Sequence, residues 1–138
     1  MNNSITDVRF FEGGNALFTV GNVKGEHYTF KIRQPKGDHK PFFVSLLTGP
    51  QNTFNYTYLG IYNPGRFSVA LTKKSRYTDE STPVKVIRWA LKIIALGRKL
   101  PAGYTIQHEN KCCCCGRTLT TPESIEKGIG PECAKKFK

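Results

Sequence analysis

The cysteines constrain this chain more than any other feature, because all five lie after residue 111. Four of them are consecutive, at positions 112–115, and the fifth is Cys133. A disulfide framework spreads its cysteines through the chain and belongs to an oxidising compartment, whereas this clustering favours a metal site. The segment 112–133 is short and polar and buries little apolar surface by itself. We therefore expect a bound metal to supply its folding energy.

Spacing selects two of the four consecutive cysteines. Two sulfurs that bind one zinc ion from a tight turn are typically separated by two residues, which lets the turn aim both sulfurs inward. Cys112 and Cys115 have this spacing, and Gly116 follows at a position where such turns favour a residue tolerant of positive φ. Cys113 and Cys114 are then predicted to be dispensable for metal binding.

The third ligand is expected from a helix start. Thr121-Pro122 is a helix-start signal, and Gly128 is a stop signal. The Gly130-Pro131 step then begins another helical turn that contains Cys133, where the helix dipole favours a thiolate.

The fourth ligand is left open by spacing alone. His108 lies four residues before Cys112, and the alternatives are Cys113 or Cys114, Glu109, or a water. Structural zinc sites are normally closed by four protein ligands, which favours His108 over water. The prediction is one structural Zn²⁺ ion bound by His108, Cys112, Cys115 and Cys133. An iron–sulfur cluster, a catalytic zinc and a set of free thiols are the less favoured interpretations.

From Cys112 the chain reads Cys-x-x-Cys-Gly-Arg-x-Leu-Thr-x-Pro-Glu-Ser-Ile, and it then reads Gly-Ile-Gly-Pro-Glu-Cys up to Cys133. Over Lys111 to Lys135 this string resembles a zinc-binding domain family of unknown function that is common in proteins of tailed bacteriophages and prophages. In that family a histidine often precedes the first cysteine, as His108 does here. The chain departs from the pattern at residues 113–114, where varied, often polar or basic residues are usual. The resemblance implies phage origin and metal binding, and it implies no reaction.

Residues 1–78 are predicted to form β-strands. Five segments rich in aromatic and β-branched residues are separated by turn signals that contain Gly, Pro and Asn. Evenly spaced short strands of this kind predict an antiparallel sheet, to which residues 104–106 add a last short strand. The five expected strands are residues 16–20, 27–33, 42–47, 53–62 and 66–71.

One amphipathic helix is expected at about residues 83–97. Thr82 is a suitable N-cap, Pro83 suits the first helical position, and Gly97 is a suitable stop. Four apolar residues recur at helical spacing and are expected to face the sheet: Ile87, Ala90, Leu91 and Ile94. The predicted fold is α+β, with a β-rich core and its helix in residues 1–103 and a zinc-binding motif, the C-terminal knuckle, in residues 104–138.

The chain is strongly basic, with a net charge of +11 at pH 7 and a pI near 9.6. Residues 81–138 hold eleven Lys or Arg against four Asp or Glu. A basic chain is attracted to polyanions, and nucleic acid is the commonest of these in a cell. The basic stripe on the predicted helix is either a solvated surface or a ridge that faces phosphates. The expected contacts to phosphates or to an acidic partner are Lys85, Arg88, Lys92, Lys111 and Arg117.

Aromatic residues alternate in the segment 53–62. Phe54, Tyr56, Tyr58 and Tyr62 have one parity, so in an extended strand they share a face. That face is either part of the core or an exposed surface on which single-stranded bases stack. Each buried tyrosine would need a polar outlet, so three tyrosines keep the second interpretation open. Tyr56 and Tyr58 are therefore candidate binding residues.

No catalytic constellation is found, so neither enzyme activity nor a small-molecule substrate is expected. No Gly-rich phosphate loop with its lysine is present, and His27 and His39 lack a paired nucleophile or carboxylate. No apolar run approaches the ~20 residues of a membrane-spanning helix. The N-terminus lacks a basic start followed by an apolar stretch. We expect no membrane contact and a location in the host cytoplasm.

Two functional classes follow from these patterns. The first is a small phage-type accessory protein that binds nucleic acid, single-stranded or with little sequence preference. The alternative is an inhibitor or adaptor that binds a host protein with an acidic, DNA-like surface. RNA polymerase and an anti-phage defence nuclease are targets of this kind, the second giving an anti-CRISPR or anti-restriction role.

Overall fold

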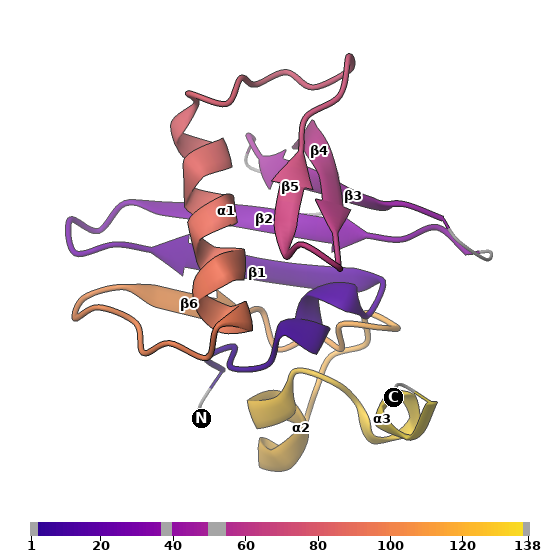
Figure 1. Ribbon diagram of the computed structural model, residues 1–138. Coiled ribbons are helices and arrows are strands. Elements are labelled where there is room, and N and C mark those ends of the chain that lie inside the picture. The colour runs from indigo at the N-terminus through magenta and orange to yellow at the C-terminus, as the bar shows by residue number, and fades with distance from the viewer. Residues whose placement is uncertain (1–2, 37–39, 50–54, 137–138) are drawn as a thin grey trace.

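Six strands form one antiparallel sheet in the order β5-β4-β3-β2-β1-β6. The structure is a computed structural model that describes residues 3–36, 40–49 and 55–136. β1 to β5 follow one another as neighbours, and α1 (Thr82–Ala95) then crosses one face of the sheet so that β6 pairs with β1 (Figure 1). The predicted α+β class, with an antiparallel sheet and a C-terminal cysteine cluster, is confirmed.

The strands lie close to their predicted positions. β2 (His27–Arg33) and β3 (Phe42–Leu47) have the predicted bounds. The other strands are β1 (Asn15–Gly21), β4 (Tyr56–Asn63), β5 (Ser68–Ala70) and β6 (Thr105–His108). The predicted β4 residues before position 55 lie outside the described residues. The sequence did not predict the 3-10 helix η1 (Val8–Glu12), whose N-cap Asp7 accepts a hydrogen bond from the Arg9 N–H.

α1 packs its apolar stripe against the sheet. The four residues predicted to face the sheet are all buried, and they meet buried β-strand residues such as Phe18 and Phe30 in one core. The N-cap is Ser81 rather than Thr82, so the predicted cap is wrong by one residue. The Ser81 hydroxyl accepts a hydrogen bond from the Thr78 N–H and makes no cap bond. The chain leaves the helix at Gly97 with a φ of 65°, as the stop signal predicts.

A β-bulge divides the tyrosines of β4 between the two faces of the sheet. Val44 pairs with Gly60 but the next residue, Ser45, pairs with Tyr58, so Leu59 has no residue opposite. Tyr56 and Tyr58 therefore lie on the face that α1 leaves uncovered, whereas Tyr62 lies in the core.

The Tyr62 hydroxyl donates a 2.7 Å hydrogen bond to Glu12, which is the polar outlet that a buried tyrosine needs. The prediction that Tyr62 shares a face with Tyr56 and Tyr58 is wrong, because the bulge changes the parity between them. Phe54 lies outside the described residues.

The C-terminal tail contains two short helices, α2 (Pro122–Lys127) and α3 (Pro131–Lys136). Both helix starts and the Gly128 stop agree with the sequence signals: the Thr121 hydroxyl caps α2, and Gly128 has a φ of 72°. Within the described residues, no helix has the length and apolar character that crossing a membrane requires.

Candidate functional site

The four consecutive cysteines form a tight turn at the start of the tail. The Gly116 N–H donates to the Cys112 carbonyl at 2.9 Å, and the Cys112 N–H donates to the Arg117 carbonyl at 2.8 Å. Gly116 has a φ of 78°, a left-handed conformation that glycine adopts at little cost, as the knuckle pattern predicts. A β-bridge between Lys111 and Thr118 closes the loop.

Sulfur atoms from this turn and from α3 converge on one point. The Sγ atoms of Cys112, Cys114 and Cys133 all lie within 4.8 Å of one another. Cys115, which is exposed, is not part of this group of three, but its side chain interacts with the thiols of Cys112 and Cys133 and so lies beside them. The structure thus brings together two of the three predicted cysteines, Cys112 and Cys133, with Cys114, which spacing alone had set aside, and places Cys115 at their border. We call these four residues the sulfur cluster.

Backbone N–H groups point at the most buried sulfur of the cluster. The Cys114 and Gly130 N–H groups lie 3.4 Å and 3.3 Å from the Cys112 Sγ. Burial alone would raise the pKa of the Cys112 thiol, but N–H donors from Cys114, Cys115 and Gly130 together outweigh it and lower the pKa to about 7. The turn is therefore built to stabilise a thiolate at Cys112, and the thiolate is the form that binds metal.

The Cys114 and Cys133 thiols hold their protons in the absence of a cation. Burial raises the pKa of Cys133 to about 12, and hydrogen bonds with the thiols of Cys112 and Cys115 add to the effect. Burial, followed by the negative charge on Cys112, likewise raises the pKa of Cys114. Further thiolates cannot form within 4.8 Å of a thiolate at Cys112 unless a cation compensates the negative charges. A soft divalent metal would do this and would displace the protons.

Cys113 is buried in the main hydrophobic core. A Cβ atom at Gly13 would lie 2.7 Å from the Cys113 Sγ, so the chain at Gly13 has room only for glycine. The Asn15 N–H and side-chain amide donate to the carbonyls of Cys113 and Cys114, at 2.6 Å and 2.9 Å. Burial raises the pKa of the Cys113 thiol well above its ordinary range. Cys113 therefore anchors the knuckle on the sheet.

Both ring nitrogens of His108 are occupied by the protein itself. Nε2 donates to the Ile125 carbonyl of α2, and Nδ1 accepts from the Asn110 N–H at 3.0 Å. The ring is 2% exposed and stacks on Phe10, with 5.6 Å between the ring centroids. The structure does not bring His108 into the sulfur cluster, and ligation would require one ring nitrogen to give up its present partner. As placed, His108 joins β6 to α2.

The titration of His108 provides a test of this arrangement. Burial lowers the pKa of His108 below its ordinary value of 6.5. Below pH 6.5 the unfolded chain therefore binds a proton at His108 that the folded chain does not bind. The contribution of the neutral His108 ring to the free energy of unfolding is complete above pH 6.5 and is lost as the pH falls through the pKa of the folded state.

We expect the NMR signals of the His108 ring to titrate below the ordinary histidine pKa of 6.5. A ring bound to a metal would not titrate in this range, and its nitrogen shifts would change when the metal is removed. That result would restore His108 to the ligand set, and a pKa at or above 6.5 would contradict the buried, neutral ring.

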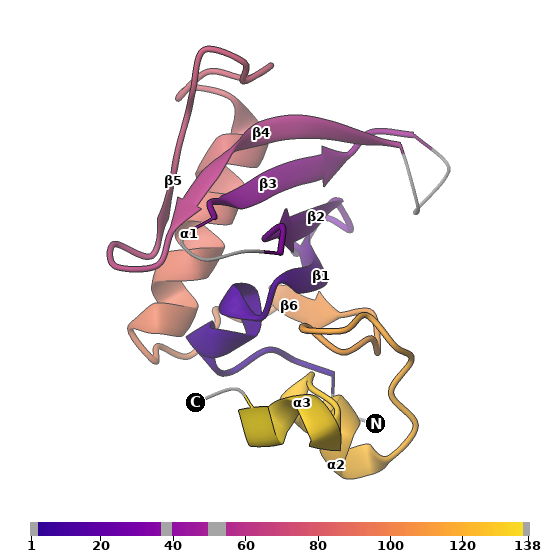
Figure 2. The same ribbon diagram turned by 90° about the vertical axis from the view of Figure 1, so that its right-hand side faces the viewer.

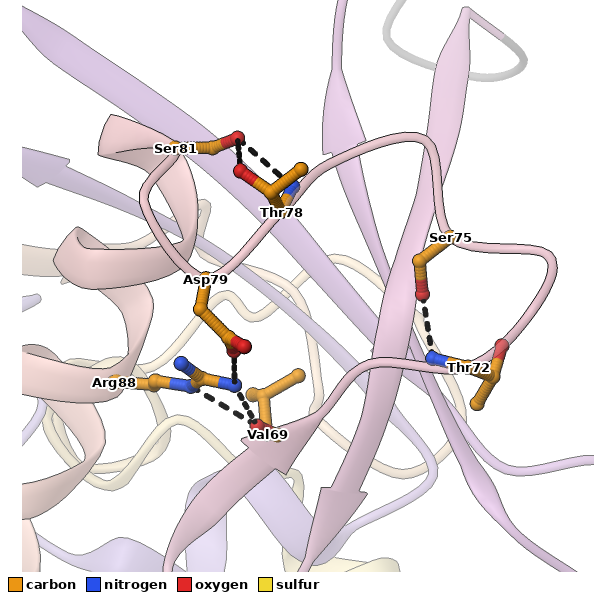
Figure 3. Close-up of polar contacts among 7 residues, drawn as sticks. All are labelled: Val69, Thr72, Ser75, Thr78, Asp79, Ser81 and Arg88. Atoms are coloured by element: carbon orange, nitrogen blue, oxygen red, sulfur yellow. Dashed lines mark hydrogen bonds and ion pairs between the residues drawn. The ribbon is translucent and has the colours of Figure 1, made fainter.

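The basic stripe on α1 makes intramolecular contacts instead of an open ridge. The Arg88 guanidinium donates to the Val69 carbonyl of β5, at 2.9 Å and 3.0 Å, and pairs with Asp79 at 2.8 Å (Figure 3). Lys92 donates to the Arg66 carbonyl at 2.6 Å. Both side chains thus fasten α1 to the β5 edge.

Lys85, the third residue of the stripe, forms an exposed ion pair with Glu80 at 3.4 Å. The positive charge of the stripe is therefore partly compensated within the chain. The sequence left two interpretations of the stripe, a solvated surface and a ridge that faces phosphates. The contacts match neither fully, because Arg88 and Lys92 have structural partners.

The uncovered sheet face collects aromatic and basic side chains from neighbouring strands. Figure 2 shows α1 on one side of the sheet and no helix across the other. Strand alternation and register place aromatic residues of β3 and β4 beside basic residues of β2 on that side. The residues concerned, which we call the open face, are Lys31, Arg33, Phe43, Tyr56 and Tyr58.

Within the open face the side chains contact one another. The Lys31 ammonium lies 5.3 Å from the centroid of the Tyr56 ring, in cation–π geometry. Phe43, which is 37% exposed, packs edge-on against Tyr58 with 6.2 Å between the ring centroids. The Tyr56 hydroxyl is buried and has no hydrogen-bond partner in the part of the chain that the structure describes.

A basic turn borders the open face next to β4. The Tyr58 hydroxyl shares a 3.1 Å hydrogen bond with Thr72, and the Arg76 N–H donates to the Tyr58 carbonyl at 3.5 Å. The turn between these contacts carries Lys73 and Lys74, both exposed. The sequence analysis did not select Phe43, Lys31 and Arg33 as binding candidates. Only strand pairing brings them together, although the alternation of β2 and β3 could have placed them on one face.

The two basic candidates of the tail are exposed. Lys111 and Arg117 lie at the two ends of the knuckle turn. Glu123 of the neighbouring helix α2 pairs with Lys127 at 3.1 Å. The Arg117 side chain has no hydrogen bond or ion pair within the described residues, so its role in binding stays a prediction.

The tail has a counterpart among known protein families. Residues 105–138 match DUF6011, a family of unknown function. The matched segment begins at β6 and contains the whole sulfur cluster. The match agrees with the expected family of unknown function, and it names neither a source nor a ligand. No match was found among curated proteins or among solved structures.

Proposed function

We propose that the sulfur cluster binds one structural zinc ion through Cys112, Cys114, Cys115 and Cys133. Four sulfurs satisfy the tetrahedral, closed coordination of structural zinc sites, and N–H groups directed at Cys112 support the negative charge of such a site. Cys114 takes the fourth place, for which the sequence favoured His108, because both ring nitrogens of His108 have other partners. The ion links the knuckle to α3.

We further propose that the open face binds single-stranded nucleic acid with little sequence preference. The observation that carries this proposal is the Lys31–Tyr56 contact beside the exposed Phe43–Tyr58 pair. Aromatic rings stack on bases of any identity, and neighbouring cations attract the phosphate backbone. The net charge of +11 favours the same class of partner.

The two proposals together describe a small, basic accessory protein with a metal-stabilised tail. The resemblance of the knuckle to phage and prophage proteins supports a phage-type role, acting in the cytoplasm of the host. In this proposal the metal stabilises the fold and the sheet binds the ligand, so no reaction is assigned to either.

Fluorescence anisotropy with labelled oligonucleotides of mixed sequence tests the nucleic-acid proposal. We expect the affinity for single-stranded DNA or RNA to exceed that for a duplex of the same sequence, and to differ little between sequences. The logarithm of the association constant should fall linearly with the logarithm of the salt concentration, with a slope of about −0.7 for each phosphate contacted. Equal or tighter binding to the duplex, or no salt dependence, would refute the open face as a single-strand site.

A further inference from the structure

Apolar side chains gather on the surface at the end of α1, away from the open face. Among the described residues, four large hydrophobic side chains are exposed, and three of them lie in this one region. Val23 and Leu96 are each 61% exposed, and Tyr104 is 36% exposed. The fourth, Phe43, belongs to the open face.

Close contacts join Val23, Trp89 and Tyr104 into one surface, and helical spacing adds Leu96. The Trp89 and Tyr104 rings lie 5.4 Å apart, between α1 and the loop that leads to β6. The next residue along the loop, Gly103, is so close to the β1–β2 turn that a Cβ atom on it would lie 2.2 Å from the Val23 side chain. Leu96 follows Trp89 by seven residues, which is two helical turns, and so continues the same side of α1. We call Val23, Trp89, Leu96 and Tyr104 the end patch.

The end patch has a basic border. Lys24 follows Val23, and Arg98 and Lys99 follow Leu96; all three are exposed. None of them forms an ion pair within the described part of the chain, in contrast to Lys85 and Arg88. Glu26, the acidic residue of the same turn as Lys24, accepts a hydrogen bond from Asn22. The border therefore carries three cations beside one carboxylate and has a net positive charge.

We propose that the end patch docks a protein segment that presents an apolar anchor flanked by Asp or Glu. Exposed apolar surface rimmed by polar residues is characteristic of interaction sites, and Trp, Tyr and Arg are the residues that contribute most at such sites. The basic border selects an acidic partner and disfavours a second copy of this chain, because each copy carries +11. This inference is independent of the nucleic-acid proposal.

The end patch and the open face are separate surfaces that share no residue. The buried residues of α1 face the sheet, and Trp89, which is partly buried, packs against the core and Tyr104. The open face lies on the side of the sheet that α1 leaves uncovered (Figure 2). A partner on the end patch therefore leaves the open face free.

Selection from a random-peptide display library against the full, metal-loaded chain tests the end patch. We expect enriched peptides that combine apolar residues with Asp or Glu. Trp89 is the single tryptophan of the chain, so its fluorescence reports directly on occupation of the patch by a synthetic peptide that lacks tryptophan. Leu96→Ser should lower the affinity by at least about tenfold, equivalent to about 1.4 kcal/mol.

Matched variants distinguish peptide binding at the end patch from oligonucleotide binding at the open face. Phe43→Ser alters an exposed hydrophobic side chain on the open face and should leave peptide affinity unchanged, while Leu96→Ser should leave oligonucleotide affinity unchanged. Replacing Lys24, Arg98 and Lys99 by glutamine should lower the affinity for the peptide. It should also make that affinity less dependent on salt concentration, because it removes the positive charge of the border. Thermal unfolding monitored by circular dichroism confirms that Leu96→Ser is folded.

Four results would overturn the proposal. They are a failure to enrich peptides, enrichment of peptides without acidic residues, equal peptide affinity in the Leu96→Ser variant, and displacement of a bound peptide by single-stranded DNA. The last result would assign the end patch to nucleic acid.

Discussion

Replacing Cys112, Cys115 or Cys133 by serine is expected to abolish stoichiometric zinc binding and to unfold the tail while the sheet and α1 remain folded. Cys114→Ser is expected to do the same. The apolar cluster of the tail contains few buried residues, namely Cys112, Leu119 and Ile125. A cluster of this size cannot offset the conformational entropy of the ordered tail. Zinc bound by short structural motifs contributes about 10–16 kcal/mol at pH 7, so its loss dominates the stability of the segment.

Metal analysis combined with amide NMR spectra measures both parts of this prediction. Each variant of the sulfur cluster should contain less than one zinc per chain and should lose the dispersed signals of α2 and α3. The signals of β1 to β5 should persist. Removing zinc from the unmodified chain with a chelator should produce the same spectrum, and restoring zinc should reverse it.

Two matched controls make the assignment of ligands decisive. Cys113→Ser changes a neighbouring thiol that is buried in the core, and His108→Gln changes the nearest histidine; both should retain one zinc ion. Both should nevertheless lower the free energy of unfolding, because each side chain is buried. Loss of zinc in His108→Gln together with its retention in Cys114→Ser would restore the ligand set that spacing alone predicts.

The contrast between Cys114 and His108 shows where sequence reasoning reaches its limit at a metal site. Spacing and a helix-start signal selected Cys112, Cys115 and Cys133, because a knuckle turn and a helix start are local structures with local signals, and the structure places Cys112 and Cys133 together with Cys114. The position of the fourth group depends on tertiary packing. His108 lies in a strand whose alternation turns its ring into the core, against Phe10 and α2, and no local pattern reports that orientation.

The same distinction separates the predicted and the missed features of the sheet. Strand positions and the burial of α1 follow from periodic hydrophobicity, and these predictions hold. The bulge in β4 is the single extra residue Leu59, which has no distinctive sequence signal. It places Tyr62 in the core and leaves Tyr58 on the open face. The basic stripe of α1 has the right periodicity for a ridge, but the β5 carbonyls that engage Arg88 are distant in sequence.

The second large effect is expected at the open face. Phe43→Ala and Tyr58→Ala should each weaken binding of single-stranded oligonucleotides, and the double variant should weaken it further. Loss of a stacking ring typically costs about 1–3 kcal/mol for each base, which is about fivefold to more than a hundredfold in affinity. Lys31→Gln should weaken binding and also reduce the salt dependence, because it removes one phosphate contact.

Arg88→Gln and Lys92→Gln provide the matched comparison for this surface. They remove positive charge from the opposite side of the molecule, where both side chains donate to backbone carbonyls. We expect them to lower the free energy of unfolding by about 1–3 kcal/mol, most of it from Arg88, while oligonucleotide affinity changes little. Anisotropy titrations and chemical denaturation of the same protein samples give both quantities.

The pattern across these variants distinguishes a localised site from a diffuse attraction. If binding depended only on the net charge of +11, the loss of any one cation would have a similar effect and the two aromatic variants would have none. Binding that depends on Phe43, Tyr58 and Lys31 but not on Arg88 or Lys92 requires bases to stack on the open face. The aromatic variants are therefore the decisive ones, since they leave the charge of the chain unchanged.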